Sequence, residues 1–107
     1  MKYLVQTSYT AEACSTMIKK PQNRAEEVRK VIESLGGRVE GFWFAFGDYD
    51  TTAVYDLPDN VTAAAFSMAV SAGGAFKTVK TTPLMTVEEA IEAMKKAGKT
   101  GYRPPTK

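Results

Sequence analysis

The 107-residue chain has the length of one domain, and its 44% hydrophobic and 24% charged content is that of an ordinary globular protein. With 14 Lys and Arg against 12 Asp and Glu, the net charge of +2 is too balanced for a nucleic-acid-binding protein, which would carry a basic stripe. No apolar run approaches the ~20 residues that span a bilayer and no secretion signal is evident, so we expect a cytoplasmic protein that binds neither nucleic acid nor membrane.

Two residue types limit the chemistry that the chain can perform. Histidine is absent, which removes the Ser-His-Asp and Cys-His catalytic arrangements and the commonest ligand of transition metals. The single cysteine, Cys14, can form neither an intramolecular disulfide nor a zinc cluster, and we interpret it as a small buried hydrophobe. Neither glycine pair of the chain lies in a phosphate-binding fingerprint. We therefore expect no metal and no cofactor, and the remaining reactive groups are those of Asp, Glu, Tyr, Lys and Arg.

The first part of the chain predicts a strand, two helical segments and a second strand. Residues 2–9 are rich in β-formers and predict the first strand. A helix is expected over 10–20, where Pro21 interrupts it because proline has no N–H and clashes with the preceding turn. The helix restarts after Pro21 and ends at the glycine pair 36–37. The second strand is expected over 38–46.

The second part predicts a hairpin, a helix, a strand and a last helix. After a strand over 50–57, Asp59 or Asn60 caps a helix that ends at the glycine pair 73–74. A fourth strand is expected over 75–82. Thr86 and Glu89 form a capping box for a helix that Gly98 closes, and its apolar stripe consists of Val87, Ala90, Ile91 and Met94.

This order of elements is that of an α+β domain with a ferredoxin-like βαββαβ pattern and an extra C-terminal helix. Such a domain has one antiparallel sheet with both connecting helices on the same face. We expect the domain to cover residues 1–97, with a polar tail over 98–107.

Apolar residues on both faces of the strand 38–46 indicate an oligomer. Strict alternation places Phe42, Phe44 and Phe46 on one face, and Val39, Gly41, Trp43 and Ala45 on the other. The second long helix also has an apolar stripe, formed by Val61, Ala64, Ala65 and Met68. We expect a homodimer or higher homo-oligomer in which two sheets face each other and form a dimeric α/β barrel. The alternative is that the terminal helix covers the open face within one chain.

Most of the chain resembles the GYD domain family. The stretches SYTAEA and IKKPQNRAEEVRKVIESLGGRVEGFWFAFGDYDTTAVYDLPD carry the resemblance, which covers about residues 2–90. The Gly-x-Tyr-Asp element that names the family is present as Gly47, Tyr49 and Asp50. The resemblance implies a place in the dimeric α/β-barrel superfamily, and it implies no particular activity.

The sequence around this element predicts a tight hairpin. Gly47 and Asp48 suit a two-residue type II′ turn, which prefers glycine at its first central position. The resulting register pairs Phe46 with Tyr49, Ala45 with Asp50, Phe44 with Thr51, and Trp43 with Thr52. Asp48 then belongs to the turn, whereas Asp50 shares a face with Trp43.

Asp50 is the best candidate for a catalytic residue, as a general base in a partly apolar site beside Trp43. The alternative is that Asp50 lies near the rim of the sheet and accepts hydrogen bonds from backbone or hydroxyl groups. Tyr49 is a cross-strand partner of Phe46 or a proton donor, and Trp43 belongs to the core, the dimer seam or a pocket wall. By analogy with dimeric α/β-barrel enzymes, the resemblance implies a ligand pocket between sheet and helices, with Tyr9, Trp43, Tyr49, Asp50 and Met68 as candidate lining residues.

Two functions are compatible with these residues. One is an oligomeric small-molecule-binding domain or cofactor-independent enzyme of unknown substrate. The other is a non-catalytic ligand-sensing or assembly module, whose barrel interior is packed with the bulky Phe side chains. Arg24 is interpreted as a surface ion-pairing residue, and the alternative is that it faces the break at Pro21 and binds an anion.

Overall fold

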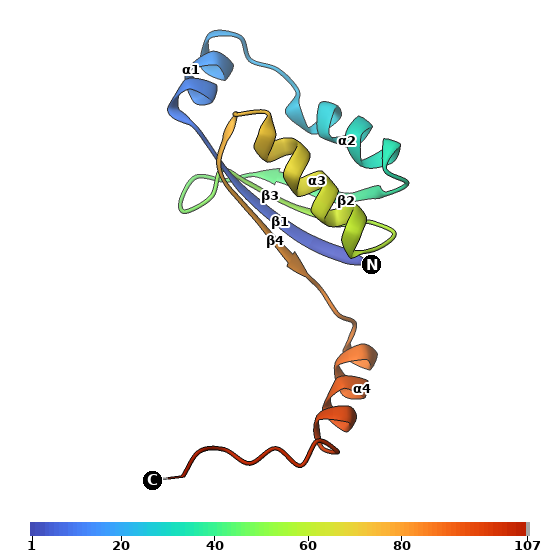
Figure 1. The fold of residues 1–107 in the computed structure, drawn as a ribbon. Helices are drawn as coiled ribbons and strands as arrows, with labels where there is room; N and C mark the ends of the chain where they lie inside the picture. The colour runs from blue at the N-terminus through green and yellow to red at the C-terminus, as the bar shows by residue number, and fades with distance from the viewer. Residues whose placement is uncertain (107) are drawn as a thin grey trace.

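A four-stranded antiparallel sheet organises residues 1–106, the part of the chain that this computed structural model describes (Figure 1). The strands are β1 (Lys2–Tyr9), β2 (Arg38–Phe44), β3 (Thr51–Asp56) and β4 (Phe76–Pro83), and the helices are α1 (Ala11–Lys19), α2 (Arg24–Ser34), α3 (Asn60–Ala72) and α4 (Val87–Ala97). The strand order in the sheet is β2-β3-β1-β4. This is the predicted ferredoxin-like arrangement, in which α1 and α2 together form the first connection and α3 forms the second.

Local capping explains where the helices begin. Asp59 is the N-cap of α3, and Thr86 and Glu89 form the capping box of α4, both as predicted. Helix α2 begins later than expected from Pro21, because the side chain of Asn23 accepts a hydrogen bond from the backbone N–H of Glu26 and caps it.

The hydrophobic core lies between the sheet and the two helices α2 and α3, which cover the same face (Figure 1). Alternate residues of β1 and β3 point toward these helices and are buried. The rings of Tyr55 and Phe66 meet edge to face with centroids 5.3 Å apart, joining β3 to α3. The core cluster consists of Tyr3, Val5, Ile32, Ala53, Tyr55, Leu57, Ala63 and Phe66.

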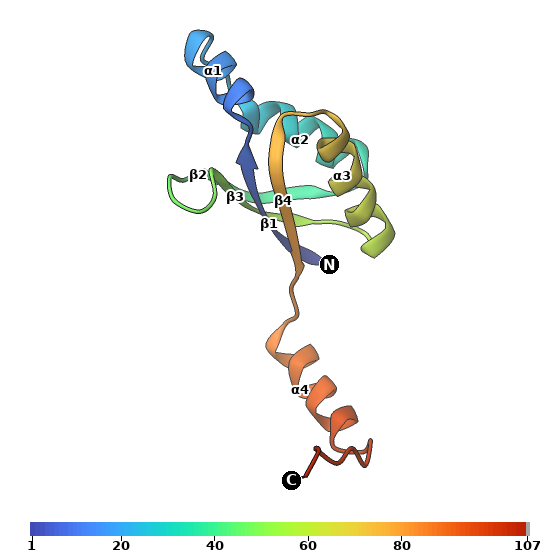
Figure 2. The same cartoon turned by 60° about the vertical axis from the view of Figure 1, so that its left-hand side comes forward.

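The other face of the sheet carries no helix (Figure 2). Helix α4 lies beyond the end of β4 in both views, so within one chain it does not cover this face. The radius of gyration of 17.5 Å exceeds the ~13 Å typical of a compact domain of this length, since α4 and the segment after it extend outward. The open face exposes Trp43, whose side chain is 59% accessible, with the half-buried Leu4 and Val54 beside it.

The expected alternation along β2 was wrong at Val39. A β-bulge places Val39 opposite Tyr55 and Gly41 opposite Val54, so that Glu40 is the extra residue. Val39 therefore packs against the core instead of sharing the open face with Trp43.

The hairpin keeps its predicted register but not its predicted turn. Trp43 pairs with Thr52 and Phe44 with Thr51, and the backbone N–H of Ala45 donates to the carbonyl of Asp50 at 2.8 Å. Gly47 lacks the positive φ that a type II′ turn requires, so the two-residue turn was wrong. Strand β2 ends at Phe44, and the side chain of Phe46 is fully exposed rather than packed on Tyr49.

Candidate functional site

Two hollows meet at Tyr9, near the break between α1 and α2. The first, of about 340 Å³, lies between the start of α1, the start of α2 and the loop 73–75. The second, of about 350 Å³, lies between the end of α1, Pro21 and the start of the β2–β3 loop. Because Tyr9, Met17 and Gln22 line both hollows, we treat them as one site, called the Tyr9 cavity.

A larger hollow of about 540 Å³ lies at the base of α4, and its chemistry is less suited to a ligand. Its charged groups are already paired, since the N-terminal ammonium group lies 3.0 Å and the Lys2 ammonium 3.9 Å from the carboxylate of Asp56. Glu89, which also lines it, caps α4 by accepting a hydrogen bond from the backbone N–H of Thr86. The Tyr9 cavity is therefore the better candidate.

Tyr9 is buried at the end of β1 and packs against β4. Its ring stacks on Phe76 of β4 with centroids 4.9 Å apart, and the residue is buried. The register of β1 against β4 shifts between Ser8 and Tyr9, which separates Tyr9 from the regular alternation of the strand. The phenol thus has a defined position in the wall of the cavity.

Asp50 connects the β2–β3 loop to the end of β1. Its carboxylate Oδ2 accepts a hydrogen bond of 2.8 Å from the backbone N–H of Tyr9. Its own N–H donates to the carbonyl of Thr7 at 2.7 Å, and the hydroxyl of Ser8 donates to the carbonyl of Asp48 at 3.1 Å. Asp50 therefore has the rim position and the backbone hydrogen bond of the alternative interpretation, and it also lines the second hollow.

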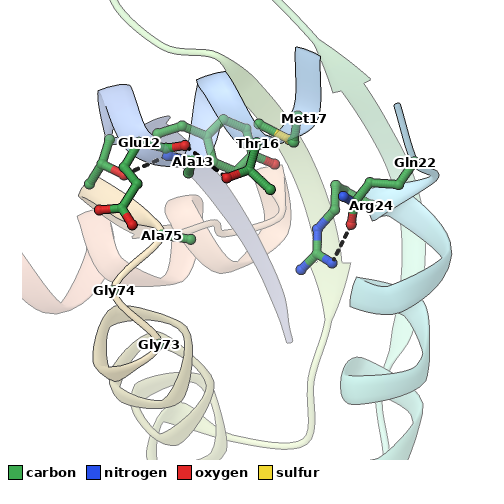
Figure 3. A pocket seen from close by; sticks show the side chains of 11 residues that line it. Glu12, Ala13, Thr16, Met17, Gln22, Arg24, Gly73, Gly74 and Ala75 are labelled. Atoms are coloured by element: carbon green, nitrogen blue, oxygen red, sulfur yellow. Dashed lines mark hydrogen bonds between the residues drawn. The ribbon is translucent and has the colours of Figure 1, made fainter. Parts of the chain in front are cut away.

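Arg24, the first residue of α2, brings a positive charge to the first hollow. Its guanidinium Nη1 donates to Oε1 of Gln22 at 3.2 Å, and the side chain is half-buried. Figure 3 shows Arg24 and Glu12 on opposite sides of this hollow. Within residues 1–106, no carboxylate forms an ion pair with Arg24. The guanidinium is thus available to an anionic group in the cavity.

The charges of Arg24 and Asp50 both act on the phenol of Tyr9. Burial raises the pKa of Tyr9 above its ordinary value of 10.0, the positive charge of Arg24 lowers it, and Asp50 and Cys14 raise it further. Since the net pKa is raised, the phenol keeps its proton at neutral pH and can donate a hydrogen bond to a ligand.

Comparison with known families assigns the chain to a family. The sequence model of the GYD domain matches residues 3–94 of the 107. The chain belongs to the GYD domain family. No curated protein and no solved structure matches the chain. The matched residues include Tyr9, Arg24 and Asp50, so the whole Tyr9 cavity lies within the GYD domain.

The GYD domain brings together two of the five predicted pocket residues. Tyr9 and Asp50 meet at the cavity, whereas Trp43, Tyr49 and Met68 line neither hollow. Trp43 lies on the open face with its ring over Gly41, which has no side chain to displace it. Tyr49 is in the β2–β3 loop, and Met68 is exposed on the outer face of α3.

The sequence did not indicate that Met17 and Gln22 line the cavity, because neither residue belongs to a recognisable motif. Cys14 was interpreted as a small buried hydrophobe. In the GYD domain Cys14 is half-buried and lines the second hollow. The sequence signal for this region was the break at Pro21, because it turns the chain so that Arg24 and Gln22 face α1 across the cavity.

The described part of the GYD domain has neither a metal-binding cluster nor a membrane-spanning helix. Within residues 1–106, no group of three or more His, Cys, Asp or Glu side chains could hold a metal ion. None of the helices in this part of the chain is long and apolar enough to cross a membrane.

Proposed function

We propose that this GYD domain binds a small organic molecule with an acidic group in the Tyr9 cavity. The observation that carries the proposal is the position of the Tyr9 phenol, which lies within the electrostatic influence of both Arg24 and Asp50 where two hollows meet. Volumes of about 340 and 350 Å³ fall in the range of small-molecule sites.

Each of the three residues has a distinct role in this proposal. The planar guanidinium of Arg24 binds the carboxylate or phosphate of the ligand through paired hydrogen bonds. The phenol of Tyr9 donates a hydrogen bond to a second polar atom of the ligand. The carboxylate of Asp50, held by the N–H of Tyr9, accepts from a hydroxyl or amino group, and in an enzymatic version of the site it is the general base.

The proposed assembly is a homodimer through the open faces of two sheets. The support for it is the exposed Trp43 with Leu4 and Val54 on a face that neither α2, α3 nor α4 of the same chain covers. Pairing two such faces would give the dimeric α/β barrel. The cytoplasmic location expected from the sequence stays a prediction.

A non-catalytic assembly module is the second candidate. The observation in its favour is the ring of Trp43, which lies over Gly41 and would fill space between two facing sheets. In that case the domain would associate without binding a ligand in the Tyr9 cavity.

Thermal shift with a panel of small acids tests the first proposal. The panel contains aliphatic and aromatic carboxylates and phosphate monoesters, each beside its uncharged amide or alcohol. We expect at least one acid, and not its neutral analogue, to raise the melting temperature of the parent protein. Arg24→Gln and Tyr9→Phe should reduce this shift.

The matched control is Arg29→Gln on the same helix. Arg29 is exposed and lies 3.8 Å from the carboxylate of Glu26, away from the cavity. This variant should keep the full ligand shift. A panel without any stabilising acid, or an equal loss in Arg24→Gln and Arg29→Gln, would count against the proposed site.

A further inference from the structure

Helix α4 has an apolar face without a partner in its own chain. The side chains of Val87 and Met94 are 72% and 68% exposed, and Ile91 between them is also exposed. A capping box at Thr86 and Glu89 defines the start of the helix. Isolated helices of fewer than about 12–15 residues are marginal in water, so an 11-residue helix needs packing to persist. The apolar face of α4 therefore needs a packing partner outside the contacts of its own chain.

Helix α3 has a second unpartnered apolar face. Val61 and Met68 on its outer side are 79% and 72% exposed, and Ala64 and Ala65 between them are exposed as well. The helix Asn60–Ala72 contains no charged residue. Because Ala63 and Phe66 are buried on its inner side, α3 has apolar residues on two sides, as is typical of a helix that is buried on more than one side.

The two faces have the same spacing of apolar residues and share three of four residue types. The stripe of α3 has Val, Ala, Ala and Met at positions 61, 64, 65 and 68, and the stripe of α4 has Val, Ala, Ile and Met at positions 87, 90, 91 and 94. The relative spacing of 0, 3, 4 and 7 is that of a helix–helix seam with large residues at its ends. In the middle of the α3 stripe, the small Ala64 and Ala65 leave room for the larger Ile91 of α4.

A groove beside α3 extends this surface. Its volume is about 270 Å³, and Ala63, Ala64 and Ser67 of α3 face Thr81 and Pro83 of β4 across it. The hydroxyl of Thr81, which lines this groove, is buried without a hydrogen-bond partner among residues 1–106.

The connection between β4 and α4 directs α4 away from its own α3. The backbone N–H of Leu84 donates to the carbonyl of Lys2 at 2.9 Å, which holds the chain at the end of the sheet. Only Met85 and Thr86 remain before α4 begins, and in both views the helix continues outward (Figures 1 and 2). To reach its own α3, the chain would have to reverse direction within these two residues.

We propose that α4 is an exchanged arm, whose Val87–Ile91–Met94 face packs on the Val61–Ala65–Met68 face of α3 in a second copy of the chain. Each copy then donates one arm and receives one, so both exposed stripes are buried by a single symmetric exchange. This contact is separate from the proposed pairing of open sheet faces, because α3 lies on the opposite side of the sheet.

Disulfide trapping between two chains of different mass tests the exchange. Both chains carry Cys14→Ala, one carries Ala65→Cys and the other, made larger by a fused tag, carries Ile91→Cys. We expect mild oxidation of the mixed, equilibrated chains to produce a covalent product with the summed mass of the two. The matched control replaces Ile91→Cys with Ala93→Cys, which lies about 200° around α4, and should give little product.

A second measurement tests the same contact without a cysteine. Ile91→Glu with Met94→Glu should weaken the packing of α4, lowering the helical circular dichroism signal at 222 nm and the melting temperature. Met68→Glu on α3 should lower the melting temperature to a similar extent, and adding the arm variant to it should cost little more because both disrupt one contact.

Two results would overturn the exchange. One is a disulfide that forms only inside a single chain carrying both Ala65→Cys and Ile91→Cys, which would place α4 on its own α3. The other is the absence of the mixed product together with additive effects of the α3 and α4 variants.

Discussion

The carboxylate of Asp50 accepts a hydrogen bond of 2.8 Å from the backbone N–H of Tyr9, across 41 positions of the sequence. This bond joins the last residue of the Gly-x-Tyr-Asp element to the end of β1 and to the wall of the Tyr9 cavity. The element that names the family therefore has a structural role at the cavity, whether or not Asp50 also acts on a ligand.

Replacing Asp50 tests this connection. We expect Asp50→Ala to lower the free energy of unfolding by about 1–2 kcal/mol, because the partly buried N–H of Tyr9 loses its acceptor. Asp48→Ala in the same loop is the control, since the side chain of Asp48 is exposed, and it should change stability by less than about 0.5 kcal/mol. Urea unfolding at one fixed protein concentration measures both. Equal effects of the two variants would show that the bond contributes little.

Trp43 provides a direct probe of the open sheet face. It is the only tryptophan of the chain, so the intrinsic fluorescence excited at 295 nm reports on this face alone. We expect its emission maximum to move to longer wavelength on dilution, as pairs of sheet faces separate and the ring meets water. Trp43→Ala should lower the mass measured by light scattering at a given concentration. Phe46→Ala, at a fully exposed loop residue, should leave the mass unchanged.

Gly37 is expected to resist substitution for a steric reason. A Cβ at this position would lie 2.6 Å from the carbonyl oxygen of Asp56 and 2.6 Å from the side chain of Leu57. Because one of these atoms belongs to the backbone, Gly37→Ala should destabilise the fold by about 1–3 kcal/mol. At Gly47, where a Cβ would meet nothing within 4 Å, the same substitution should be tolerated. A smaller loss for Gly37→Ala than for Gly47→Ala in urea unfolding would contradict this account.

The positive charges near Asp56, at the start of β1 and β2, predict that the stability of the fold decreases at acidic pH. The N-terminal ammonium group, hydrogen-bonded to Asp56, lowers the pKa of that carboxyl below 3.8, and Lys2 and Arg38 lower it further. A carboxyl with a lowered pKa in the folded state contributes stability above its ordinary pKa, and this is lost as the pH falls through the lowered value.

Melting temperatures between pH 2 and 6 measure this contribution. The difference between the parent protein and Asp56→Asn should be largest at pH 5–6 and should shrink as the pH falls below about 4. The group is solvent-accessible, so the effect should also decrease in high salt. Glu33→Gln, whose side chain forms no ion pair within residues 1–106, is expected to show no such trend.

Much of the fold was predictable because its signals are local. Asp59, Thr86 and Glu89 mark helix starts through bonds to residues three positions away, and Gly36 and Gly74 mark helix ends with φ values of +81° and +78°. Runs of β-forming residues indicated strands, and the order of strands and helices predicted the antiparallel sheet. The GYD domain family was recognised from the sequence itself, through the Gly-x-Tyr-Asp element and the stretches around it.

The site was predictable only in part. Tyr9 and Asp50 were both candidates, but nothing local indicated that the N–H of one would bind the carboxylate of the other. Trp43 and Met68 were expected near them by analogy, yet they lie on other surfaces. The bulge at Glu40 and the longer β2–β3 loop depend on how the strands fit together, which alternation along a single strand does not express.

The sequence by itself therefore determined the elements and their order, because these follow from interactions within a few residues, and its similarity over most of the chain determined the family. Only the tertiary structure decided that the break at Pro21 turns Arg24 toward the Tyr9 cavity, that Val39 joins the core and that α4 leaves the sheet. These outcomes depend on contacts between residues far apart in the chain, where packing and backbone hydrogen bonds outweigh local preference.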